Sequence, residues 1–172
     1  MFASKTLGRA TVAASLFLLA FAAPAWADSA KSLGKFGDWT SFAYSDKTGK
    51  ICYAVSKPKR SLNAPKGRDE TYLTITHRPG EKSFDVVSVT AGFAFKKDST
   101  AELDVSGAVF DLYTQLDTAW SRTDKAVVQA MAKGKSVVFH GNPGKGEAVA
   151  DTYSLEGFPK ALAEIDKACG AK

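Results

Sequence analysis

The chain has 172 residues, of which 45% are hydrophobic and 24% are charged, and its formal net charge is +5. Two of the basic residues, Lys5 and Arg9, lie in a segment with the features of a removable export signal, and without them the formal charge is only +3. A net charge this small argues against nucleic acid as a partner. The residues that remain, 28–172, are enough for a single domain with a hydrophobic core.

Residues 1–27 have the pattern of a secretory signal peptide. Two basic residues come first, residues 10–23 form an apolar run, and Ala25-Trp26-Ala27 provides a small-residue cleavage site. The apolar run is too short to span a bilayer, and no later segment is comparably hydrophobic. We therefore expect cleavage near Ala27, export to the periplasm or beyond, and no transmembrane segment in the mature chain. The alternative is an uncleaved membrane anchor.

The rest of the chain alternates between apolar and polar residues in short runs that are separated by turn residues. Alternation with a period of two is typical of β-strands that have one buried face. Eight short strands are predicted, at residues 36–44, 50–56, 70–78, 83–91, 101–105, 108–113, 137–139 and 149–155. The first two pairs have turn-like connections and are expected to form hairpins.

Two helices interrupt this pattern. Residues 117–134 contain apolar residues at helical spacing, with Thr123 as the start signal and Gly134 as the stop signal. Near the C-terminus, an apolar stripe begins at Phe158 and recurs every three or four residues up to Cys169. The pattern as a whole predicts a mainly β fold, an antiparallel β-sandwich with a short crossing helix and a C-terminal helix.

The chain has only two cysteines, Cys52 on a predicted strand and Cys169 at the end of the last helix. An even number of cysteines in an exported chain favours a disulfide, because the oxidising compartment permits it. Such a bond would join the C-terminal helix to the second strand. The alternative, a reactive thiol or a metal ligand, lacks the CxxC motif or the neighbouring histidine that those functions use.

Residues 57–69 form a long polar segment with five basic side chains, two prolines and one glycine. The basic residues are Lys57, Lys59, Arg60, Lys66 and Arg68. We expect this segment to be exposed and mobile, to contribute nothing to the core, and to contact a partner, which is either an unknown protein or an anionic envelope component. The alternative is a solvated loop without a partner.

No motif predicts a catalytic residue, a metal site or a cofactor. The two histidines, His77 and His140, do not form a metal-spaced pair and are expected at the surface or rim of the sheet. Residues 141–146 share the glycine spacing of a phosphate-binding loop, but Glu147 and Ala148 replace its lysine and hydroxyl. The enzymatic alternative is a hydrolase of envelope polymers in which one of the histidines acts as the base.

The aromatic residues are expected mainly in the core, as is usual at this spacing. They are Phe36, Trp39, Phe42, Tyr44, Phe93, Phe95, Phe110 and Tyr113. If they instead lined an open groove, the protein would be a binder of a polysaccharide or a small ligand.

Several of these features resemble the invasion associated locus B family of Gram-negative envelope proteins. They are the run Phe36-Gly37-Asp38-Trp39 soon after the signal peptide, a cysteine on the next strand, and the ending from Asp151 to the closing Cys169. Residues 127–146 are also similar to the family's middle segment. The resemblance implies an immunoglobulin-like β-sandwich in the periplasm or outer envelope, a non-enzymatic interaction module, and no catalytic residues to carry over to this chain.

Overall fold

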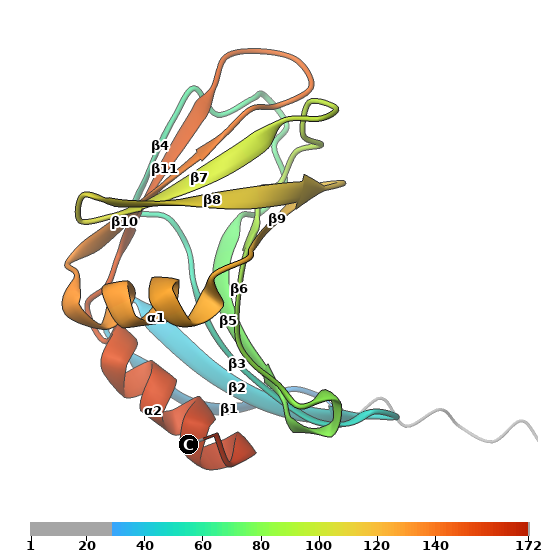
Figure 1. Ribbon diagram of the computed structural model, residues 1–172, viewed down its shortest axis with the longest axis vertical. Helices are drawn as coiled ribbons and strands as arrows, with labels where there is room; N and C mark the ends of the chain where they lie inside the picture. The colour runs from blue at the N-terminus through green and yellow to red at the C-terminus, as the bar shows by residue number, and fades with distance from the viewer. Residues whose placement is uncertain (1–28, 172) are drawn as a thin grey trace, which may run out of the picture.

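The computed structural model describes residues 29–171 and shows eleven strands in one antiparallel sheet with two helices (Figure 1). The strands are β1 (Lys31–Phe36), β2 (Trp39–Asp46), β3 (Gly49–Ser56), β4 (Arg60–Leu62), β5 (Tyr72–Arg78), β6 (Ser83–Thr90), β7 (Thr100–Val105), β8 (Ala108–Gln115), β9 (Thr118–Ser121), β10 (Ser136–Gly141) and β11 (Val149–Ser154). The helices are α1 (Asp124–Lys133) and α2 (Phe158–Cys169), and a 3-10 turn covers Pro79–Glu81.

The predicted signal peptide, residues 1–27, lies outside the described residues. Within residues 29–171, no helix is long and apolar enough to cross a membrane.

The sheet bends back on itself, and the two halves face each other. The strand order is β1-β2-β3-β5-β6-β9-β8-β7-β10-β11-β4. The short strand β9 pairs with β6 on one side and β8 on the other, so it joins the two halves. Figure 1 shows both helices on the concave side of the bend, with α1 near the join and α2 along β1, β2 and β3. The predicted mainly β, antiparallel class is confirmed, and the immunoglobulin-like detail stays a prediction.

The core fills the space between the halves, because alternate residues of each strand point inward. In β5, for example, Leu73 and Ile75 are completely buried. Trp39, at the start of β2, is also completely buried, and its ring packs against Phe158 of α2 with centroids 4.8 Å apart. Its Nε1–H donates to the backbone carbonyl of Ser154 at 2.9 Å, so the start of β2 is held to the end of β11.

Three of the eleven strands, β1, β4 and β9, were not expected from the sequence. They have between three and six residues, and an alternating pattern is hard to recognise over so short a run. β9 lies inside the range predicted as helical, residues 117–134, so that range is wrong at its N-terminal end. The helix itself begins at Asp124, after the predicted start residue Thr123, and ends before Gly134.

α2 confirms the predicted C-terminal helix. Phe158, Ile165 and Cys169 are buried as expected, whereas Leu162 is only partly buried and Ala161 takes a core position in its place. The turn before the helix needs Gly157, which has a φ of 86°, and a Cβ at this position would collide with the carbonyl oxygen of Phe36.

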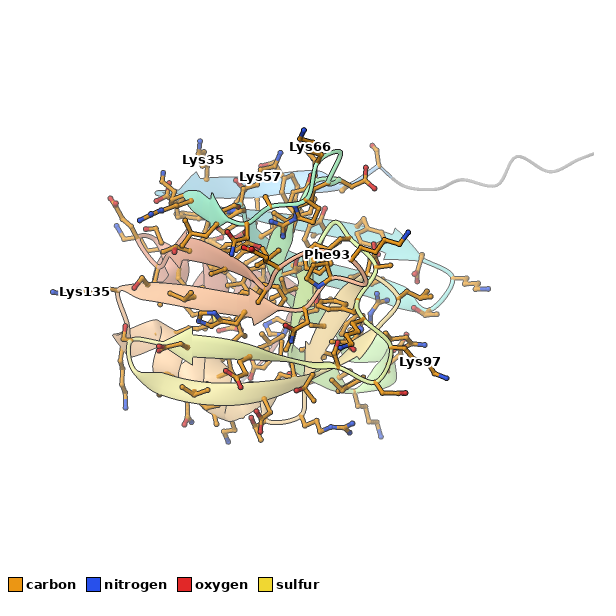
Figure 2. The ribbon with its side chains drawn as sticks, turned by 90° about the horizontal axis from the view of Figure 1, so that it is seen from above. Lys35, Lys57, Lys66, Phe93, Lys97 and Lys135 are labelled. Carbon is orange, nitrogen blue, oxygen red and sulfur yellow. A yellow bond between two sulfur atoms is a disulfide. The ribbon has the colours of Figure 1, made fainter. Side chains whose placement is uncertain are left out.

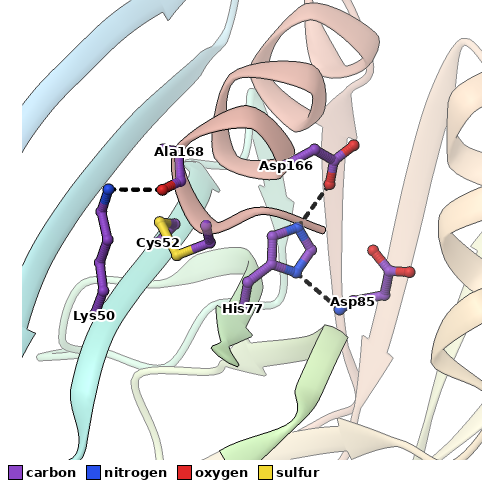
Figure 3. The surroundings of a disulfide bond; sticks show 7 residues. Lys50, Cys52, His77, Asp85, Asp166 and Ala168 are labelled. Carbon is purple, nitrogen blue, oxygen red and sulfur yellow. Dashed lines mark hydrogen bonds and ion pairs between the residues drawn. A yellow bond between two sulfur atoms is a disulfide. The ribbon is translucent and has the colours of Figure 1, made fainter. Parts of the chain in front are cut away.

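The predicted disulfide between Cys52 and Cys169 is present, with Cα atoms 6.0 Å apart (Figure 3). It joins β3 to the last residue of α2 across 117 positions of sequence. A crosslink over so long a loop removes much of the conformational freedom of the unfolded chain.

Replacing both cysteines, as Cys52→Ala with Cys169→Ala, should lower the free energy of unfolding by about 4 to 5 kcal/mol. Urea denaturation of the oxidised protein and of the double variant measures the difference. Reduced wild-type protein is the control and should unfold like the variant. A loss below about 1 kcal/mol would show that chain entropy is not what this bond contributes.

Candidate binding site

An open groove of about 620 Å³ lies on the outer face of the half that contains β1, β2, β3 and β5. Its residues alternate along the strands with core residues. In β2, Thr40 and Phe42 line the groove, while their neighbours Trp39, Ser41 and Ala43 are buried. The groove is therefore the outer side of the strands whose inner side carries the core.

The strand register arranges the groove residues in rows. Lys35, Thr40, Val55 and Thr74 are successive partners across β1, β2, β3 and β5, and they form the middle row.

Phe42 and Tyr53 pair at one end of the groove, two residues along the strands from the middle row. Asp38, Lys57 and Tyr72 lie two residues from the middle row in the opposite direction, and all three line the groove. Because two residues of strand extend about 7 Å, the aromatic side chains at the two ends stand roughly 13 Å apart.

The aromatic rings at the two ends are partly exposed and pack against neighbouring side chains. Phe42 and Tyr53 stack with centroids 5.2 Å apart and an interplanar angle of 20°, and Tyr44 meets Tyr53 edge-on. Burial raises the pKa of Tyr53, so its hydroxyl stays protonated. At the other end, Lys57 Nζ lies 5.3 Å from the centre of the Tyr72 ring.

The prediction that the aromatic residues fill the core is therefore only partly right. Trp39 is buried, and Phe36, Phe93, Phe95 and Phe110 pack against the core. The prediction is wrong for Phe42, Tyr44 and Tyr113, which lie on the outer faces of their strands. An aromatic-lined groove of the kind required by the polysaccharide or small-ligand alternative is present.

Four of the five predicted basic residues are exposed: Lys57, Lys59, Arg60 and Lys66. Lys57 lines the groove and Lys59 pairs with Asp38 at its end, whereas Arg60 lies on β4, which pairs with β11. Figure 2 shows Lys57 and Lys66 on the same side of the molecule as Lys35 of β1. Two of the four have acidic neighbours, because Lys57 pairs with Glu70 at 2.6 Å and Lys59 with Asp38 at 2.7 Å. The hydrogen bond to Lys59 lowers the pKa of Asp38, and the same bond raises the pKa of Lys59. Exposed ion pairs of this kind are weak, so an anionic ligand can compete for the lysines.

The side chain of the fifth basic residue, Arg68, is only 7% exposed and does not lie on this surface. Its guanidinium makes two hydrogen bonds to the completely buried Asp151 of β11, and its Nε–H donates to the carbonyl of Ala91 at 2.6 Å. Ser61 of β4 donates to the same carboxylate at 2.6 Å, and β4 itself pairs with β11. The segment 57–69 is thus attached to the sheet at β4 and at Arg68. The expectation that the basic residues are exposed and not needed for the fold is wrong for Arg68, whose side chain is buried against Asp151. β4 is exposed as expected, but it is a strand paired with β11 and not a loop.

Arg68→Ser should destabilise the protein by roughly 3 to 5 kcal/mol, because it leaves the Asp151 carboxylate buried without its charged partner. Lys66→Ser removes the same charge from the same segment but from an exposed position, and should change stability by less than about 0.5 kcal/mol. Urea denaturation of the two variants measures both effects. Equal stabilities would mean that the ion pair is not needed to hold the segment.

The two histidines occupy opposite environments. His140 on β10 is exposed, as predicted, but His77 on β5 is completely buried, so the expectation of a surface or rim position is wrong there. The register of β5 and β6 shifts beside His77, and this bulge brings the backbone N–H of Asp85 to Nδ1 of the ring at 3.0 Å. Nδ1 therefore accepts, and Nε2–H donates to Asp166 Oδ1 of α2 at 2.8 Å (Figure 3).

This cluster is better explained as a structural contact than as a catalytic or metal site. Potential ligand atoms of His77, Asp85 and Asp166 lie within 4.8 Å of one another, but both ring nitrogens already bond to protein atoms. His77 points into the core, whereas His140 points outward from a strand that does not neighbour β5. The two histidines therefore do not face a common cleft, an arrangement that would have favoured the hydrolase alternative.

Asp166→Ala should destabilise the protein by about 1 to 3 kcal/mol, because it leaves the buried Nε2–H of His77 without its acceptor. Asp166→Asn keeps a carbonyl oxygen at this position and should cost less. Glu164→Ala, on the same helix, is the matched control in urea denaturation. If Asp166→Ala and Glu164→Ala unfolded at the same urea concentration, the contact would contribute nothing to the attachment of α2.

Comparisons with known proteins agree with this architecture. The family model described as invasion associated locus B (IalB) protein matches residues 39–166. A crystal structure of invasion associated protein b from Bartonella henselae is similar, with a TM-score of 0.59 and 17% sequence identity, over 80% of this chain and 97% of that chain. At this identity the likeness concerns the fold alone. No curated protein matches the sequence. The family match covers most of the chain and confirms the resemblance noted from the sequence, so the protein belongs to the invasion associated locus B family.

Proposed function

We propose that the protein is exported to the cell envelope and acts there without catalysis, as a module that binds an anionic envelope component. Three features support export: the signal-like residues 1–27, the disulfide, which an oxidising compartment favours, and membership of the invasion associated locus B family. The positions of the two histidines, one buried in hydrogen bonds and one exposed elsewhere, support a non-catalytic role.

The observation that carries the proposal is the placement of exposed basic side chains beside the open groove. Lys57 and Lys35 line the groove itself, and Lys59 pairs with Asp38 at its end. The backbone that carries Lys57 and Lys59 is ordered before any ligand arrives, because Arg68 and β4 attach it to β11, and Lys35 belongs to the paired strand β1. A pre-positioned charged surface loses less conformational entropy on binding than a mobile loop would.

At long range, the attraction between the exposed basic side chains and the anionic component should be electrostatic. Exposed charges act over a Debye length of about 8 to 10 Å at physiological salt, so added salt should weaken association with an anionic surface.

Replacing Lys57, Lys59, Arg60 and Lys66 with serine should reduce association with washed Gram-negative envelope fragments by roughly tenfold, since it removes the exposed basic side chains of the segment 57–69. Cosedimentation of the oxidised protein, residues 28–172, measures the bound fraction at low and high salt. Arg68 is left unchanged because it is needed for the fold.

The matched control replaces four exposed lysines elsewhere, Lys97, Lys125, Lys135 and Lys145, and so changes the net charge by the same amount. The control should bind like the wild type. An equal loss in both variants would show that only net charge matters, and binding that survives the first variant and high salt would contradict the proposal.

A further inference from the structure

We propose that the groove binds an extended acidic glycan, a polysaccharide whose sugar rings carry carboxylate groups. This inference rests on the proposed contact with an anionic component and specifies its chemical class. It is carried by the combination, in one groove, of stacked aromatic rings, hydroxyl groups and lysines.

The aromatic residues suit sugar rings, because one face of a pyranose exposes mainly C–H groups and packs on an aromatic ring as apolar surface does. The stacked pair Phe42 and Tyr53 stands at one end of the groove and Tyr72 at the other, roughly 13 Å apart along the strands. A ligand that touches both ends must be extended, which favours an oligosaccharide over a single sugar. All three side chains belong to paired strands, so little ordering is needed on binding.

The polar residues of the groove suit the hydroxyl and carboxylate groups of such a ligand. Thr40 and Thr74 provide hydroxyls in the middle row, and Asp38 can accept hydrogen bonds from sugar hydroxyls. Lys35 on β1 and Lys57 after β3 are separated by two strand spacings and two residues, so their Cα atoms lie about 12 Å apart. The two lysines therefore provide separate charged donors for carboxylates.

A single-stranded nucleic acid would also use aromatic and basic side chains, but this groove suits it less well. Asp38 lines the groove, and Glu70 lies against Lys57 and contacts the hydroxyl of Tyr72. The carboxylates of Asp38 and Glu70 can accept hydrogen bonds, and a phosphodiester strand offers them few hydroxyl donors. An acidic glycan carries hydroxyl groups on every ring that can donate to these carboxylates, while its own carboxylates bind the lysines, so it can use both kinds of group.

Isothermal titration calorimetry with the oxidised wild-type protein, residues 28–172, tests the ligand class without any substitution. The probes are an oligogalacturonate, a neutral cello-oligosaccharide of the same length, an oligoglutamate and an oligothymidylate. We expect the oligogalacturonate to bind at least roughly tenfold more tightly than each of the others. Equal or tighter binding of the oligoglutamate or the oligothymidylate would overturn the inference, as would the absence of oligogalacturonate binding.

Tyr72→Ala tests the stacking directly and should raise the Kd for the oligogalacturonate by roughly tenfold, because it removes the only aromatic ring among the described residues that lines this end of the groove. Tyr72→Phe keeps the ring and should bind like the wild type. The matched control is Tyr113→Ala, which removes an exposed tyrosine with Arg122 above its ring from the outer face of β8. Circular dichroism verifies that each variant is folded.

The failure of this inference differs from the failure of the proposed function. If Tyr72→Ala bound the oligogalacturonate like the wild type, the groove would not be the glycan site and the inference would be wrong. The proposed contact with an anionic component would still stand if the fourfold serine variant lost its association with envelope fragments while its matched control kept it. Loss of the oligogalacturonate in Tyr72→Ala, with retention in Tyr72→Phe and Tyr113→Ala, supports the glycan site.

Discussion

The closure of the bent sheet at Trp39 is the interaction on which the rest of the structure depends. The indole N–H of Trp39 donates to the carbonyl of Ser154, and the backbone N–H of Asp38 donates to the carbonyl of Glu156 at 3.1 Å. These contacts join the start of β2 to the end of β11, residues more than a hundred positions apart. The indole ring also supports Phe158, so the closure places the first turn of α2 on the sheet. The disulfide and the contact between His77 and Asp166 then hold the other end of the helix.

This closure also decides which surface is free to bind. The helices and the opposite half of the sheet cover the inner face of β2, β3 and β5, so only the outer face of these strands can receive a ligand. Asp38, at the end of the groove, directly precedes the buried Trp39, and its neighbour Lys59 donates its own backbone N–H to Thr152 of β11 at 2.8 Å. Lys59 beside the groove and the backbone hydrogen bonds that close the sheet therefore belong to the same stretches of chain. This explains why a polar segment can keep a fixed position beside the groove.

The sequence predicted the features that depend on local patterns. Alternation predicted most strands, helical spacing predicted α2, and the number of cysteines predicted the disulfide. The pairing of Arg68 with Asp151 could not be predicted, because the two residues are 83 positions apart and only the register of β4 on β11 brings them together. Two errors were avoidable. In β5, His77 follows Leu73 and Ile75 at every second position, so alternation places it on the same inner face. In β2, Phe42 is an odd number of residues from Trp39, so alternation places it on the outer face.

The central claim is that the outer face of β2, β3 and β5 is the binding surface of this family member. Amide chemical shifts of the isotopically labelled wild-type protein, followed by NMR during titration with an oligogalacturonate, test this claim most directly. The account predicts that the largest shifts occur at the middle row of the groove, at Thr40, Val55 and Thr74, and at Lys57. Shifts concentrated on β7, β8 and β10, or spread evenly over the exposed lysines, would contradict it.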